Sequence, residues 1–284
     1  MPATAPSSAK PSPAAGSTNP DADAVMEANR RFYDTIAGVY DQVDSRRKGN
    51  LPHPWVEGLV QEMIDLRTQY GGPVTAPLHL LDAGTGSGFL AYRAAALINS
   101  ITLVDVSQAM LDRIDLPEAA KICSGCEQVP LEAGSVDLIG AFATLHHLYD
   151  PLTFFAEAAR LLVPGGVLYT DHDIERRFVK NFHLPLKAYR KVFDHGHGYL
   201  SACPEAEERD YHLSEFHGDS GLPGPDLRAA LERLGFTIIR EDYHWQGMGA
   251  PETLVGKVGL KGLLSRRGFA PILRLMAVKT GEPQ

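Results

Sequence analysis

The hydrophobic positions of the 284-residue chain follow two spacings, and the change between them divides the sequence. After Pro54, apolar residues recur three and four positions apart, which is typical of a helix with one buried face. From Leu78 the pattern becomes short apolar runs separated by helical stretches. The predicted strands are Leu78–Leu81, Ile101–Val104, Val136–Ala141 and Val167–Thr170, and the predicted helices are Phe89–Leu97, Ala109–Ile114 and Leu152–Leu162. This alternation predicts a parallel sheet covered by helices on both faces.

Two later regions depart from this alternation. The segment from Ile174 to Pro225 matches no strand–helix unit, and it follows a strand at the edge where open α/β sheets bind ligands. We therefore expect it to form a cap. Beyond it, a helix over Leu227–Leu234 precedes two strands, Thr237–Asp242 and Ile272–Val278, with no convincing helix between them. Two strands without a crossover helix predict an antiparallel pair.

The composition limits the classes of function that the chain can serve. The net charge is −8, which argues against nonspecific binding to nucleic acid because that needs clustered lysine and arginine. No run of eighteen apolar residues occurs, so no transmembrane segment is expected. Three cysteines are too few for a disulfide framework, and the first residues lack the apolar core of a secretory signal. These features predict a cytoplasmic protein with a disordered tail over residues 1–22.

The strongest chemical signal is a glycine-rich turn after the first predicted strand. Gly84, Gly86 and Gly88 alternate directly before a helix, so the backbone can turn sharply and approach a ligand with no Cβ in the way. A dinucleotide-binding turn needs a glycine at its sixth position, where this chain has Phe89. Asp105 closes the next strand, where a carboxylate can take both hydroxyls of a ribose. The pattern therefore favours a ligand that contains ribose but no pyrophosphate over a dinucleotide.

These motifs and others in the same order resemble the class I S-adenosylmethionine-dependent methyltransferases, specifically the methyltransferase type 11 group. The matching stretches are Phe32–Asp41, Leu81–Gly88, Val104–Ser107, Gln128–Gly166 and Leu234–Phe236. The resemblance implies a Rossmann-like, doubly wound α/β fold with a seven-stranded sheet, mostly parallel with one antiparallel strand, plus the inserted cap. With the pattern above, it divides the chain into a helical lead-in (23–77), a cofactor-binding core (78–173), an acceptor cap (174–225) and a C-terminal part of the core with a basic insertion (226–284).

Carried onto this chain residue by residue, the resemblance implies a site for S-adenosylmethionine. Gly84 and Gly86 would pack against the amino-acid portion of the cofactor. Asp82 would hold its ammonium group through water, and Asp105 would take the ribose. Tyr40 matches the tyrosine that reaches the cofactor carboxylate.

The rest of the expected cofactor site is less uniform. Further expected contacts are Gly88 in the turn, Val106 beside the ribose acid, Met110 against the adenine and the main chain around Thr144 at the methionyl end. Gly125 stands where the family has an acid that takes the adenine amino group. Cys126 and Glu127 are therefore expected to substitute for it, through backbone amides or the Glu127 carboxylate.

Two histidines are candidates for chemistry on the acceptor. His147 is expected to be the ring nearest the sulfonium, with its neighbour His146 in a structural role. His172 lies in the stretch Asp171–Asp173 after the strand that precedes the cap, where an imidazole can act as a general base. The same stretch could instead seat a divalent ion or cap loop backbone. We expect no metal site.

For two other features, a structural role is preferred over a role in binding. Cys123 and Cys126 form a Cys-x-x-Cys that is expected to line a strand end rather than to bind zinc. A basic amphipathic segment near the C-terminus is expected to be a solvated face, with contact to an anionic membrane or an acidic substrate as the alternatives. Its basic residues are Lys257, Lys261, Arg266, Arg267 and Arg274.

The function implied is direct displacement of the sulfonium methyl group by a lone pair of a small-molecule acceptor. Positioning of the two reactants would supply most of the rate enhancement. A base is needed only if the acceptor is a hydroxyl or an acidic carbon. Two alternatives stay open. One is methyl transfer to a lipid, a quinone or a macromolecule, which the basic C-terminal segment favours and which is compatible with peripheral membrane contact. The other is a protein that binds S-adenosylmethionine without transferring its methyl group.

Overall fold

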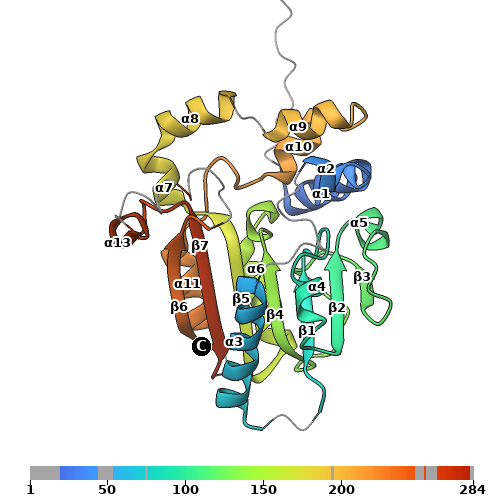
Figure 1. Ribbon diagram of the computed structural model, residues 1–284, viewed down its shortest axis with the longest axis vertical. Coiled ribbons are helices and arrows are strands. Elements are labelled where there is room, and N and C mark those ends of the chain that lie inside the picture. The colour runs from blue at the N-terminus through green and yellow to red at the C-terminus, as the bar shows by residue number, and fades with distance from the viewer. Residues whose placement is uncertain are drawn as a thin grey trace, which may run out of the picture.

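The computed structural model describes residues 20–43, 54–73, 76–192, 195–246, 253 and 261–281. The tail predicted over 1–22 lies almost wholly outside these residues, as does Lys257 of the basic segment. A single sheet forms the centre of the molecule, with helices on both of its faces (Figure 1). Within the described ranges, no helix is both long enough and apolar enough to cross a bilayer.

Seven strands form the sheet in the order β3-β2-β1-β4-β5-β7-β6. In chain order they are β1 (His79–Ala83), β2 (Ser100–Asp105), β3 (Ala120–Cys123), β4 (Val136–Phe142), β5 (Leu162–Ile174), β6 (Phe236–His244) and β7 (Ile272–Lys279). The pairs from β3 to β5 are parallel, and β7 lies antiparallel between β5 and β6. The predicted fold class, including its single antiparallel strand, is confirmed.

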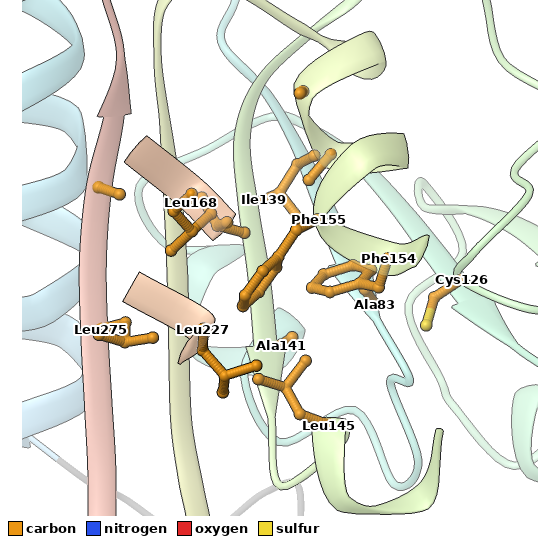
Figure 2. Packing of buried hydrophobic residues seen from close by; sticks show 14 of the residues in the cluster. Ala83, Cys126, Ile139, Ala141, Leu145, Phe154, Phe155, Leu168, Leu227 and Leu275 are labelled. Carbon is orange, nitrogen blue, oxygen red and sulfur yellow. The ribbon is translucent and has the colours of Figure 1, made fainter. Parts of the chain in front are cut away.

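Five helices bury the two faces of this sheet. One face is covered by α3 (Pro54–Gly71), α4 (Ala91–Ala94) and α5 (Gln108–Asp112), and the other by α6 (Pro151–Leu161) and α11 (Gly224–Arg233). Phe154 and Phe155 of α6 belong to the same buried cluster as Ile139 and Leu168 of the central strands (Figure 2). Leu227 brings α11 into that cluster. The apolar faces predicted for the helix after Pro54 and for Leu152–Leu162 are therefore the buried ones.

The edge strand β3 and the first helix differ from the prediction. β3 has the sequence Ala-Lys-Ile-Cys, in which only Ile122 is even partly buried, so it carries no alternating pattern. Within the helical lead-in, the sequence favours a short helix over Arg30–Tyr40. The structure instead has α1 (Ala22–Ile36), which begins eight residues before Arg30. Asp21 caps it by accepting a hydrogen bond from the Ala24 amide at 2.9 Å.

The segment predicted to be a cap forms four helices near the carboxyl ends of the parallel strands (Figure 1). They are α7 (Arg176–Asn181), α8 (His183–Val192), α9 (His195–Ala202) and α10 (Glu208–Ser214). α1 packs along α10, and α2 (Tyr40–Val43) packs against α9. Arg31 of α1 donates to both carboxylate oxygens of the buried Asp210 in α10, at 2.8 and 2.7 Å. Helices from the N-terminal lead-in and from the cap thus form one roof.

An irregularity near the end of β5 separates side chains that the sequence places together. The register with β7 shifts between Thr170 and Asp173, and His172 adopts a positive φ of 66°. The Asp171 side chain bonds Tyr169, His244 and Arg274, whereas Asp173 bonds His146. Asp171, His172 and Asp173 therefore do not converge on one point.

Candidate functional site

A cavity of about 270 Å³ opens where β1, β2 and β4 end, beneath α1, α2, α9 and α10. Its volume is near the lower end of ligand pockets, which span roughly 300–1,000 Å³. The wall contains four carboxyl groups and, among the residues that the structure places there, no lysine or arginine. The four acids are Asp82, Asp105, Glu127 and Glu215. Such a wall suits a ligand that carries positive charge.

The glycine-rich turn forms the floor of this cavity. Gly84 and Gly86 line it with φ of 64° and 53°, a conformation that glycine adopts without strain. A Cβ on Gly84 would lie 2.5 Å from the Cγ2 atom of Thr144, whose hydroxyl donates to the Ala83 carbonyl at 3.1 Å. The turn and the end of β4 are therefore packed so closely that only glycine fits, and their backbones face the cavity.

Two buried acids are held beside the turn by backbone donors. Asp105 accepts from the Gly86 amide at 2.8 Å and from the Ser107 amide at 2.9 Å. Asp82 accepts from the Thr85 hydroxyl at 2.8 Å and from the Ala91 amide at 3.1 Å. Burial raises the pKa of Asp105 to about 6 and that of Asp82 to about 7, and the hydrogen bonds offset only part of this effect. A ligand with polar hydrogens or positive charge would favour the ionised form of both.

Glu127 and Cys126 also line the part of the cavity beside the glycine-rich turn, which we call the turn side. A Cβ on Gly125 would lie 2.9 Å from the Oε2 atom of Glu127, so this carboxylate occupies the space beside the glycine. Burial raises the pKa of Glu127, and the Cys126 thiol lies 3.8 Å from its Oε2 atom. Burial also raises the pKa of Cys126 well above its usual range, which disfavours the thiolate that metal binding needs.

The roof of the cavity is aromatic. Tyr33 and Tyr40 from the N-terminal helices and Tyr199 and Tyr211 from the cap all line it. The rings of Tyr40 and Tyr199 are stacked with centroids 5.9 Å apart, and Tyr33 meets Tyr40 edge-on at 6.2 Å. Tyr40 therefore lies over Gly86, where a Cβ would come within 4.0 Å of its hydroxyl.

The two histidines of η2 (Leu145–His147), a 3-10 helix after β4, both line the cavity but are held differently. His147 Nδ1 lies 2.6 Å from the Ser214 carbonyl, so it carries the proton, and Nε2 lies 3.3 Å from the Tyr33 hydroxyl. Burial, reinforced by the neighbouring His146 ring, lowers the pKa of His147 to about 4. Both ring nitrogens of His147 thus have partners within the protein.

His146 instead forms a pair with the buried Asp173. Asp173 Oδ1 accepts from His146 Nδ1 at 2.8 Å and from the His146 amide at 3.0 Å. When Nδ1 carries the proton and donates it to the carboxylate in a hydrogen bond, Nε2 is the unprotonated nitrogen of the neutral ring. The Oε2 atom of Glu215, at the end of α10, lies 3.7 Å from this nitrogen. This is the arrangement in which a carboxylate orients an imidazole as a base.

His172 belongs to a different cluster. Its ring stacks on Phe142 with centroids 4.2 Å apart, and its Nδ1 lies 3.1 Å from Asp171. Burial opposes ionisation of Asp171, but His172 and His244 outweigh it and hold the pKa of Asp171 well below its usual range. Arg274 donates to the same carboxylate at 3.1 Å. The cluster is a buried charge network that ties β5 to β6 and β7.

The cavity brings together most of the residues expected from the sequence. Tyr40, Asp82, Gly84, Gly86, Asp105, Val106, Cys126, Glu127, Thr144 and His147 all line it. Gly88, Met110 and His172 are described but lie outside that lining. The sequence did not single out Tyr33, Tyr199 or Glu215, and it gave His146 only a structural role. Nothing in a single sequence links Glu215 to a histidine almost seventy residues earlier, because the cap fold makes that contact.

Comparison with known proteins identifies the family. Residues 81–170 match the family described as methyltransferase domain. Demethylmenaquinone methyltransferase from Chlamydia pneumoniae is 35% identical over 215 residues, which is 68% of this chain and 86% of that protein. This chain belongs to the S-adenosylmethionine-dependent methyltransferases. A second relative of the methyltransferase, malonyl-[acyl-carrier protein] O-methyltransferase from Dechloromonas aromatica, is 31% identical over 61% of this chain and 62% of its own length.

Solved structures agree with the fold of the methyltransferase. A putative methyltransferase from Haloferax volcanii, in complex with a methyltransferase activator, matches 90% of this chain with a TM-score of 0.56 and 18% identity. Magnesium protoporphyrin IX methyltransferase from Synechocystis, with bound SAH, also matches 90% with a TM-score of 0.52 and 14% identity. These solved structures share the fold of the methyltransferase. Its cofactor, S-adenosylmethionine, follows from membership of the family.

Proposed function

We propose that this methyltransferase transfers a methyl group to a hydroxyl oxygen of a small molecule, with His146 as the base. The observation that carries the proposal is that His146, which lines the cavity, pairs at 2.8 Å with the buried Asp173 behind it. A base is needed only when the attacking atom carries a proton that must leave. A buried carboxylate aligned on an imidazole suits that task.

The turn side of the cavity would hold the cofactor. The close approach of Gly84 to Thr144 leaves a cradle that a Cβ would fill, and Asp105 and Asp82 stand on either side of it. Asp105 would bind the ribose hydroxyls, and Asp82 and Tyr40 the amino-acid end. Glu127 beside Gly125 would accept from the adenine amino group. The cofactor supplies an electrophilic methyl group on a sulfonium.

The acceptor would lie between this cradle and η2. The His146 Nε2 atom would take the hydroxyl proton as the acceptor oxygen bonds to the methyl group, and Asp173 would stabilise the imidazolium that forms. His147, whose two nitrogens are both engaged, would hold the segment in place rather than move a proton. The aromatic roof would exclude water, which strengthens the electrostatic interactions inside.

Carbon methylation of a quinol-type ring is the second candidate. It is favoured by the similarity to demethylmenaquinone methyltransferase. The same base would then take a proton from the ring hydroxyl or carbon. The two candidates differ in the atom that receives the methyl group.

The test replaces Asp173 by asparagine, which keeps the shape but cannot hold the imidazolium as a carboxylate does. We expect unchanged affinity for S-adenosylhomocysteine by calorimetry, but a large loss of labelled methyl transfer into the small-molecule fraction of a cell extract. The exposed Asp226→Asn is the matched control and should behave as the wild type. Full transfer by the Asp173→Asn variant would reject His146 as the base.

A further inference from the structure

Basic residues gather in two stretches of this acidic protein from which acids are absent. Residues 176–192 contain six lysines and arginines and no aspartate or glutamate. Residues 253–281 contain six more and again no acid. The chain as a whole has a net charge of −8, so this separation of charge is strong. Neither the cavity nor the His146–Asp173 pair uses these residues.

The fold brings the two stretches into contact. Asn181 at the end of α7 donates to the Gly268 carbonyl at 2.8 Å, and the Phe182 and Phe269 rings meet edge-on with centroids 6.4 Å apart. A Cβ on Gly268 would lie 3.0 Å from the Cγ atom of Arg177. Figure 1 shows the consequence: α7 lies near α13 (Lys261–Leu264), and α8 continues above α7 on the same flank of the molecule.

Exposed cations and exposed apolar side chains share this flank. Leu184 is 66% exposed, the highest value among the exposed large hydrophobic residues of the described chain, and Phe269 is 40% exposed. Lys180, Leu184 and Lys187 are spaced by four and three residues along nearly continuous helix, so they project from one side. We call this surface the basic face; it comprises the exposed residues Arg177, Lys180, Leu184, Lys187, Arg266 and Phe269.

We propose that the basic face docks the methyltransferase on an anionic phospholipid surface. Lysine and arginine near such a surface each contribute to binding, and apolar side chains among them insert at the boundary between headgroups and acyl chains. A soluble polyanion would bind the cations but would give no favourable contact to the exposed Leu184 and Phe269. The combination therefore fits a lipid surface better than nucleic acid or an acidic protein.

The test measures co-sedimentation of the full-length protein with vesicles of phosphatidylcholine alone and of phosphatidylcholine with phosphatidylglycerol. We expect binding only to the anionic vesicles, and loss of most of it at high salt. The double variant Lys180→Glu/Lys187→Glu should lower the partition coefficient about tenfold or more, because each basic residue at the surface contributes on the order of a few-fold. Leu184→Ser should weaken binding at low and at high salt, because it removes the apolar contact.

The matched control is Arg209→Glu/Arg233→Glu, which changes the net charge equally at exposed positions outside the basic face. It should bind vesicles as the wild type does, and all variants should keep the wild-type melting temperature with S-adenosylhomocysteine. Equal vesicle binding by the two double variants would overturn the proposal. So would an absence of binding to anionic vesicles, or retention on heparin without binding to vesicles.

Discussion

Replacing Asp105 by alanine should separate cofactor binding from folding in this methyltransferase. The side chain accepts from two backbone amides, at 2.8 Å from Gly86 and 2.9 Å from Ser107, which fixes the carboxylate at the cavity edge. Two ribose hydroxyls donating to it would each contribute about 1.5–3 kcal/mol as hydrogen bonds to a charged group. The alanine variant should therefore bind S-adenosylhomocysteine roughly a hundred- to ten-thousand-fold more weakly.

The same substitution has a smaller effect on stability. It removes the acceptor of the fully buried Ser107 amide, which costs about 1–3 kcal/mol of the free energy of unfolding. Asp105→Asn should be intermediate in affinity, because its single carbonyl oxygen can still accept from a ribose hydroxyl but carries no negative charge.

Calorimetry with S-adenosylhomocysteine, below the melting temperature of the variant, measures the effect on affinity directly. The exposed Asp112→Ala, a few residues along the chain on α5, is the control and should bind as the wild type does. An unchanged affinity in folded Asp105→Ala protein would show that the acid does not contact the ribose, and the assignment of the turn side would be wrong.

Three further outcomes follow from the burial and charge of the site. Because the ligand-free pKa values of Asp105 and Asp82 are raised to about 6 and about 7, S-adenosylhomocysteine should bind more tightly as the pH rises through that range and then level off; calorimetry at several pH values that found constant affinity would contradict this. Arg31→Ala should weaken the packing of α1 on α10, because it removes the partner of the buried Asp210. Hydrogen exchange should then speed up in α10 more than in the sheet, and an unchanged exchange rate in α10 would contradict this role of the pair. Asp171→Ala should destabilise the fold by about 3–5 kcal/mol, because it removes the buried carboxylate that pairs with Arg274 and His244, yet leave cofactor affinity unchanged; a wild-type melting temperature would refute that role.

The sheet was predictable because its signals are local. Short apolar runs bounded by glycine and acids specify buried parallel strands, and the missing crossover helix specifies the antiparallel pair. The edge strand Ala120–Cys123 could not be found this way, since an exposed strand with one partly buried residue has no pattern to detect. Helix α1 was predicted only from Arg30, although its buried positions recur three and four residues apart, so this part of the pattern was present in the sequence and was missed. These positions are Val25, Ala28, Phe32 and Ile36.

In the candidate site, too, local sequence signals were predictive and long-range contacts were not. The turn side depends on glycines and acids at strand ends, so sequence spacing was enough to place Gly84, Gly86 and Asp105 in one cavity. The acceptor side depends on contacts between η2, the end of β5 and the cap. The bulge at His172 places that ring against Phe142 and leaves Asp173 facing His146. No local sequence pattern predicts such a bulge.

The most direct test of the account is the position of an isotopically labelled methyl group after reaction with a cell extract. Wild-type protein and His146→Ala would be incubated with labelled S-adenosylmethionine, and the products identified by mass spectrometry and NMR. We expect label on an oxygen of a small molecule, formed by the wild type and lost in His146→Ala while cofactor affinity is retained. Label on carbon, on protein or on nucleic acid, or equal labelling by the two proteins, would contradict it.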